Sequence, residues 1–85
     1  MSNAAVKLAR PIKRGETEIT EVTFREPGAG ELRGLDMFDV IRMGINAHRT
    51  LIPRISNITA NEFDQLAPKD LLNVQTEVVG FFTGE

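Results

Sequence analysis

The sequence predicts an α+β fold, with an N-terminal β-hairpin followed by three to four α-helices in one small domain. Three observations predict it. Residues 6–12 alternate between apolar and other side chains, which is typical of a strand. Residues 17–25 are rich in β-branched side chains and follow a glycine-containing turn. After Asp36 the spacing of the apolar side chains becomes helical.

The hairpin is predicted over about residues 6–25. Residues 1–5 precede it, and we expect them to be a disordered or tag-like N-terminus. The turn lies at residues 13–16, which include a glycine free to adopt a positive φ. Pro11 has no N–H for a ladder, so the first strand is an edge strand or ends there. Residues 6–85 form the single α+β domain.

The second predicted strand does not keep a simple alternation. Ile19 falls on the opposite face from Val22 and Phe24. Either a bulge shifts the register, or both faces of the hairpin are partly covered. Because a two-stranded hairpin is only marginally stable in water, we expect it to pack on the helices or on a partner's sheet.

A long helix is predicted from Met37 onward, with Asp36 as its N-cap. Its polar side chains form one stripe, and its apolar side chains form a wide arc, which predicts burial on more than one side. Pro53 marks a kink or an end of this helix. The apolar arc comprises Phe38, Val40, Ile41, Ile45, Ala47, Leu51 and Ile52.

Two further helices carry local start and stop signals. Thr59 and Glu62 have the spacing of a capping box, which opens a short helix. Pro68 suits the first position of the last helix, and Asp70 lies in its first turn. Gly84 is a suitable stop for that helix.

Composition limits the class of protein. A chain of 85 residues is one small domain, and small domains without staples often gain stability by oligomerising. The absence of cysteine excludes disulfides and thiolate metal sites. A formal net charge of -2 gives no field that attracts nucleic acid. No apolar run in the sequence approaches the length of a membrane span.

No set of residues forms a recognisable catalytic, cofactor or metal site. His48 is the single histidine, borders the predicted apolar face and has no second ligand, so a structural role is favoured. The glycine-rich residues 28–30 lack the lysine and the strand–helix context of a phosphate loop, and we interpret them as a break. Capping and solvation explain Glu31, Asp36 and Asp39.

The basic side chains of the hairpin are candidates for a phosphate-binding patch. Acidic side chains lie across the same hairpin, so we expect cross-strand ion pairs instead. The two sets are Lys7, Arg10, Lys13 and Arg14 on one side and Glu16, Glu18 and Glu21 on the other.

The apolar segment at residues 78–82 is the candidate partner-binding site. Four large apolar side chains in five positions cover more than one face of a helix. The pattern does not decide between packing in the core and a contact with a subunit or partner. The candidate residues are Val78, Val79, Phe81 and Phe82.

Three blocks of the sequence, in this order, resemble one phage protein family. The first runs from Pro11 to Leu35, the second is LIPRIS at residues 51–56, and the third joins Leu71-Leu72 to residues 78–82. Together they resemble the small tail assembly chaperones of P2-like and Mu-like contractile-tailed phages and prophages. The resemblance spans nearly the whole chain after residue 5.

The resemblance implies a protein that is not an enzyme, acts in the host cytoplasm during tail assembly and is not found in the mature virion. Its implied partners are the tape measure protein, which it holds, and tail tube subunits, which it helps to recruit. We also expect a homo-oligomer, because the domain is small and rich in apolar side chains. The alternative is a structural component of the tail or baseplate, or a small adaptor without a chaperone role.

Phe81 and Phe82 add an expectation about the gene. Two phenylalanine codons can form an unbroken run of uridines, on which a ribosome can slip back one base. Chaperones of the resembled family often occur in a short form and a longer form that differ by such a slip. The chain would then be the short form. The other interpretation is that two aromatic core residues end a helix.

Overall fold

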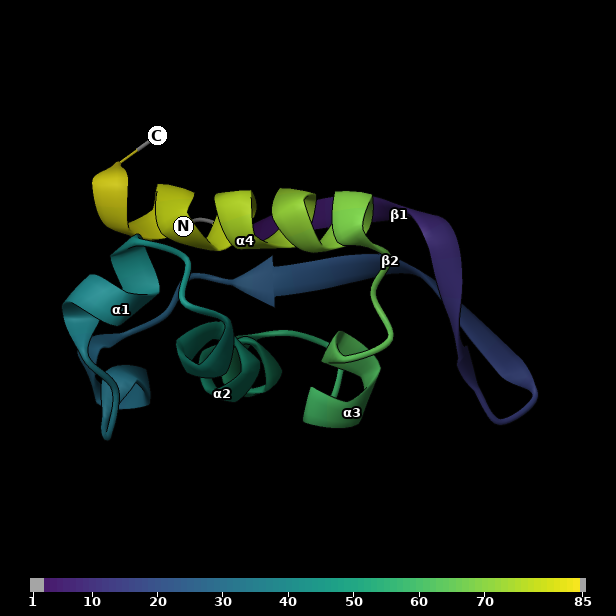
Figure 1. Ribbon diagram of the computed structural model, residues 1–85, viewed down its shortest axis with the longest axis horizontal. Coiled ribbons are helices and arrows are strands. Elements are labelled where there is room, and N and C mark those ends of the chain that lie inside the picture. The colour runs from purple at the N-terminus through teal and green to yellow at the C-terminus, as the bar shows by residue number, and fades with distance from the viewer. Residues whose placement is uncertain (1–2, 85) are drawn as a thin grey trace.

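The computed structural model describes residues 3–84 and has the predicted α+β architecture. Its antiparallel hairpin consists of β1 (Asn3–Arg14) and β2 (Thr17–Arg25). The helices that follow are the 3-10 helix η1 (Ala29–Leu32), α1 (Met37–Ile41), α2 (Ile45–Ile55), α3 (Ala60–Phe63) and α4 (Pro68–Thr83). In Figure 1, α4 runs along the hairpin, and α1, α2 and α3 form a row on the other side of β2.

One hydrophobic core joins the hairpin to the helices. Both strands and the α-helices contribute apolar side chains to it, and Val22, Leu51 and Val74 have no exposed surface. The buried apolar residues are Val6, Leu8, Ile12, Ile19, Val22, Phe24, Val40, Leu51, Ile52, Ile55, Ile58, Phe63, Leu66, Val74 and Val78. Burial of this set is what holds a two-stranded sheet in place, because such a hairpin has little stability of its own.

A bulge in β1 explains the irregular pattern of β2. Lys7 lies opposite Glu21, and Ile12 lies opposite Ile19. Residues 8–11 of β1 therefore face only one residue of β2, and the register shifts between the two pairs. Of the two predicted alternatives, the bulge is the one found. It lets Ile19 and Ile12 reach the core and leaves Pro11 where no ladder hydrogen bond is needed.

The first strand begins earlier than the predicted start of the hairpin at residue 6. β1 begins at Asn3 and so includes residues 3–5, whereas residues 1–2 lie outside the described part. Ala4 pairs with Phe24 and Ala5 pairs with Thr23. Strand pairing uses the backbone, so small side chains such as these are sufficient for it.

The long helix predicted from Met37 is two helices. α1 ends at Ile41, Met43 adopts a positive φ of 65°, and α2 begins after Gly44. The Gly44 N–H donates to the Asp39 carbonyl at 2.8 Å, and a Cβ at Gly44 would lie 3.0 Å from that oxygen. The close approach of the backbone is what requires glycine there.

The other local signals behave largely as predicted. Asp36 caps α1, Thr59 and Glu62 form the capping box of α3, and Pro68 opens α4. Gly84 ends α4 with a left-handed φ of 81°. Pro53 does not end its helix, since α2 continues to Ile55. A proline in the last turn removes only one helical hydrogen bond, while Ile52 and Ile55 are buried.

Candidate functional site

His48 is a buried structural residue in this fold. Its side chain has no exposed surface, and its Nε2 lies 2.7 Å from the Val40 carbonyl oxygen. Because a carbonyl can only accept, Nε2 carries the proton and donates it. Nδ1 has no partner within residues 3–84, and burial lowers the pKa of the ring. The imidazole thereby ties α2 to the backbone of α1 and is not accessible to a substrate.

Acidic and histidine side chains do not converge elsewhere in the described chain. Residues 3–84 contain no cluster of three or more such groups that could hold a metal ion. Within the same residues, no helix is both long enough and apolar enough to cross a bilayer.

The expected ion pairs across the hairpin are not the ones found. The register does place Lys7 opposite Glu21 and Lys13 opposite Glu18. The ion pairs among residues 3–84 nevertheless join other partners: Arg14–Glu62, Arg25–Glu31, Arg42–Asp39 and Arg49–Asp64. Arg14 pairs with Glu62 instead of a carboxylate of the opposing strand. Glu62 is already held by the Thr59 N–H, and its two oxygens accept from the guanidinium in a bidentate geometry.

The Arg14–Glu62 pair fastens the tip of the hairpin to α3. The Arg14 Nε and Nη2 atoms donate to the two Glu62 oxygens at 2.7 and 2.6 Å. The side-chain hydrogen bond from Arg14, aided by the Thr59 backbone N–H, lowers the pKa of Glu62 to about 2. Sequence reasoning assigned only the cap to Glu62, because the second partner lies 48 positions away along the chain.

Side chains from the helical part bind backbone groups of both strands of the hairpin. The Asn57 amide accepts from the Thr23 N–H at 3.0 Å and donates to the Glu21 carbonyl at 3.1 Å, as a neighbouring strand would. On β1, the Asp70 carboxylate accepts from the N–H groups of Ala9 and Arg10 at 2.8 and 3.0 Å. These contacts occupy backbone groups that an added strand would need.

The four predicted partner-binding residues occupy different environments. Val78 has no exposed surface and belongs to the core. Val79, Phe81 and Phe82 are half-buried, and the two phenylalanines pack against the core. The Phe81 ring meets Phe24 edge to face, with centroids 6.5 Å apart. Any contact of this segment with another molecule must therefore use the outer parts of Val79, Phe81 and Phe82.

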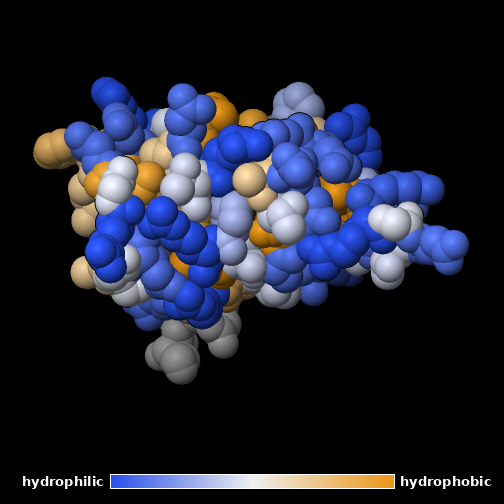
Figure 2. All heavy atoms as spheres, turned by 90° about the horizontal axis from the view of Figure 1, so that it is seen from below, coloured by the Kyte–Doolittle hydropathy of each residue, from blue (hydrophilic) through white to orange (hydrophobic). Residues whose placement is uncertain are grey.

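Most of the exposed large apolar side chains of the described residues lie instead on and beside α1, while Leu72 of α4, 57% exposed, lies apart from them in the sequence. We call Met37, Phe38, Ile41 and Ile45 the α1 surface. Phe38 is 77% exposed, and the other three are 39–49% exposed. Figure 2 shows hydrophobic side chains at the left end of the molecule, the end at which α1 lies in Figure 1. A cluster of large exposed apolar side chains is typical of an interaction surface.

The break at residues 42–44 is what exposes this surface, contrary to the predicted burial of the helix on more than one side. If residues 37–52 formed one continuous helix, their apolar side chains would lie along one shared axis, as the sequence analysis predicted. Because the chain turns at Met43, only Val40 of α1 is buried. Gly44 was the available signal for the break, although a single glycine is tolerated inside helices at a cost of about 1 kcal/mol.

An exposed apolar surface of this kind is typical of an interaction site. Comparison with known proteins defines the class. A sequence profile of the family described as "Phage tail assembly chaperone proteins, E, or 41 or 14" matches residues 5–83. The chain belongs to this phage tail assembly chaperone family.

Two curated relatives come from Escherichia phage P2. The chain is 35% identical to tail assembly protein E′ over 82 residues, which are 94% of this chain and 58% of that protein. It is also 35% identical to tail assembly protein E over 80 residues, which are 92% of this chain and 88% of that protein. The chain thus spans little more than half of E′ and most of E. No solved structure matches it significantly.

Proposed function

We propose that this chain is a chaperone that binds the tape measure protein in the host cytoplasm and assists assembly of the tail tube, without catalysis and without entering the mature virion. Family membership supports the role in tail assembly. The α1 surface is the structural observation that carries the proposed binding, because an exposed phenylalanine on a five-residue helix has no use in the chain's own core.

The contact is proposed to include the end of α4. Helix α1 lies against α4, so the half-buried Val79, Phe81 and Phe82 extend the apolar region toward the C-terminal end of that helix. A long helical tape measure protein could lay an apolar stripe on such a region, as amphipathic helices do in apolar grooves. The charges beside α1 are already neutralised, since Arg42 pairs with Asp39 at 2.6 Å.

Coexpression with the tape measure protein tests the proposal. We expect the unmodified chain to keep the partner soluble and to copurify with it. Phe38→Ser should lose this capture, because burying a large aromatic side chain contributes about 1.5–3 kcal/mol. Lys13→Ser, at the hairpin turn, is the control and should retain it, since a solvated charge contributes about 0–1 kcal/mol. Equal capture by both variants would remove the α1 surface as the contact.

Comparison of Phe81→Ser with Phe38→Ser distinguishes a loss of binding from a loss of folding. Phe81 packs on Phe24, so Phe81→Ser should lower the free energy of unfolding by about 1–3 kcal/mol as well as weaken capture. Phe38→Ser should change that free energy by less than about 0.5 kcal/mol.

Mass spectrometry of purified phage particles distinguishes a chaperone from a structural tail component, because only a structural component should be present in the particles.

A longer product of the same gene is also proposed. Two relatives match this chain over about the same region, yet E′ extends much further beyond it than E does. Phe81 and Phe82 stand near the end of the matched region, where a ribosomal slip would produce such a pair of proteins. An added domain could recruit a second partner at high effective concentration. Codons without a uridine run at these positions, or no overlapping frame, would end this proposal.

A further inference from the structure

Two hollows lie apart from the α1 surface and meet at Arg54. The first has a volume of about 600 Å³ and lies between the open end of the hairpin and the end of α2. The second has a volume of about 590 Å³ and lies beside η1. Both are large enough to take side chains of another molecule, because ligand pockets in proteins range from about 300 to 1,000 Å³.

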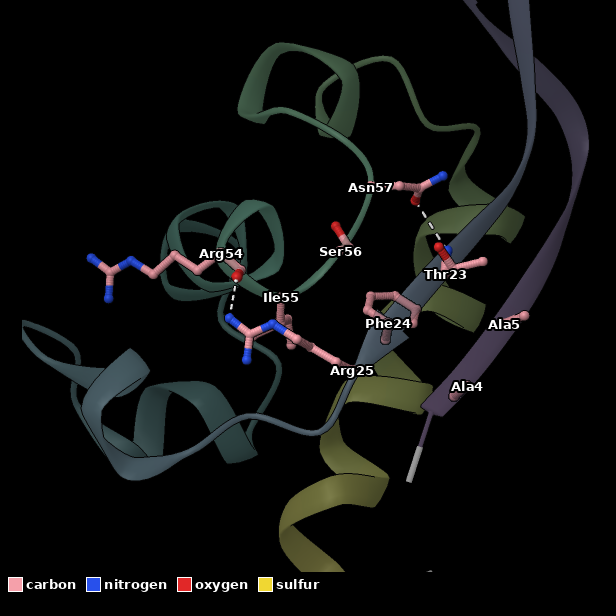
Figure 3. A pocket seen from close by; sticks show the side chains of 9 residues that line it. All are labelled: Ala4, Ala5, Thr23, Phe24, Arg25, Arg54, Ile55, Ser56 and Asn57. Carbon is pink, nitrogen blue, oxygen red and sulfur yellow. Dashed lines mark hydrogen bonds between the residues drawn. The ribbon is translucent and has the colours of Figure 1, made fainter. Parts of the chain in front are cut away.

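The first hollow has an apolar floor. Phe24 and Ile55 are almost wholly buried and present only their outer atoms to it, while Ala5 and Thr23 form its exposed wall on the hairpin. In Figure 3 the Phe24 ring lies between β2 and the end of α2, and Arg25 reaches across to the backbone of Arg54. A large apolar side chain placed here would cover this open depression and remove part of its apolar surface from water.

The second hollow has uncompensated positive charge. The Arg54 Nη1 atom donates to the carbonyl oxygens of Glu31 and Arg33 at 2.6 and 3.0 Å, which holds the guanidinium in place. Within residues 3–84, Arg54 and Arg33 have no carboxylate partner. The nearby carboxylate of Glu31 is already bound to Arg25 and to the Gly28 N–H. An anchored guanidinium with free N–H groups is well suited to a carboxylate.

We propose that the two hollows together bind an extended acidic segment of a partner protein. A large apolar side chain of the segment enters the first hollow, over Phe24 and Ile55. A carboxylate within the next few residues of the segment pairs with Arg54 and Arg33 in the second. The charge of the second hollow selects an acidic segment, and the apolar floor of the first selects a peptide over a simple anion. This contact is independent of the α1 surface.

Two fluorescein-labelled peptides test the proposal. One carries a central phenylalanine followed by three glutamates, and the other carries the same phenylalanine followed by three lysines. Fluorescence anisotropy should show at least tenfold tighter binding of the glutamate peptide at low salt, with the preference falling as salt rises. Amide shifts in NMR spectra should change at residues 23–25 and 54–57. Equal affinity for the two peptides, or shifts confined to residues 37–45, would overturn the proposal.

Paired variants locate the contact. Arg33→Glu should weaken glutamate-peptide binding at least tenfold, whereas Lys13→Glu, which changes the net charge equally, should change it less than twofold.

A second pair of variants tests the first hollow. Ala5→Trp should block the first hollow, whereas Thr20→Trp, on the exposed part of β2, should not. Unchanged binding in both Arg33→Glu and Ala5→Trp would overturn the proposal. So would a change of oligomeric mass in Ala5→Trp without loss of peptide binding, because the occupant would then be a second copy. Phe38→Ser should bind the peptide normally, which separates this proposal from the chaperone contact.

Discussion

At the residue scale, the carboxylate of Asp70 determines how the helical part meets the hairpin. Its two oxygens accept from the consecutive N–H groups of Ala9 and Arg10 inside the bulge, and the residue is only 1% exposed. Sequence reasoning placed Asp70 in the first turn of a helix, which is correct. The register-shifted backbone that it also binds lies 60 positions earlier in the chain, so no local pattern indicated it.

We expect Asp70→Asn to destabilise the protein. The amide would keep one acceptor but would turn an NH₂ group toward a backbone N–H, which leaves a buried donor without a partner. The cost should be about 1–3 kcal/mol in the free energy of unfolding, measured with urea. Asp64→Asn is the matched control, because Asp64 is exposed and its pair with Arg49 contributes at most about 1 kcal/mol. An equal loss in the two variants would contradict the role assigned to Asp70.

Glu62 makes the stability depend on acid pH. Folding lowers its pKa from 4.5 to about 2, so the unfolded chain takes up a proton more readily. The stabilisation is therefore fully present above pH 4.5 and is lost as the pH falls toward 2. Urea midpoints measured across this range should fall for the unmodified protein and for Glu18→Gln. The midpoint of Glu62→Gln should fall less steeply, and a slope equal to that of the unmodified protein would refute this.

At the scale of the elements, the sequence was sufficient to predict helix starts and ends that depend on a few neighbouring residues. It was not sufficient to predict features that depend on the tertiary fold. The caps at Asp36 and Thr59 and the stop at Gly84 are local, and they were predicted. The division of α1 from α2 was missed because the periodicity of the apolar side chains continues through residues 42–44. The exposed Phe38 was missed for the same reason, since it shares that periodicity.

Gly44→Ala tests the connection between α1 and α2. The added Cβ would lie 3.0 Å from the Asp39 carbonyl oxygen, so α1 would have to shift. We expect a loss of about 1–3 kcal/mol in the free energy of unfolding, as for other overpacked sites. Gly28→Ala is the control, because its Cβ would meet no atom within 4 Å. Thermal unfolding followed by circular dichroism measures both, and a Gly44→Ala variant as stable as Gly28→Ala would contradict this reading.

At the scale of the whole molecule, the expected homo-oligomer stays a prediction, and the structure suggests which surface it would use. Side chains of Asn57 and Asp70 bind backbone groups of the two strands, which disfavours association through an added strand. The α1 surface provides another route. It would place two copies of the chain face to face through Phe38 and its neighbours, because exposed apolar area is what subunit contacts bury.

We expect sedimentation equilibrium at high micromolar concentration to show a mass above that of the monomer. Phe38→Ser should return the protein to the monomer, because it removes the largest exposed apolar side chain of the α1 surface. Thr20→Ser, on the exposed part of β2, should leave the mass unchanged. A monomer at all concentrations for the unmodified chain would end the proposal of a homo-oligomer.

The contact between Asp70 and the bulge also sets an order of events during synthesis. The acceptors for Ala9 and Arg10 are made only after 60 further residues have been added to the nascent chain. Until α4 leaves the ribosome, the hairpin has neither the carboxylate that fixes its shifted register nor the helix that covers β1. The bulged residues of β1 are therefore expected to reach their native contacts only after α4 has left the ribosome, although they are among the first residues to be made.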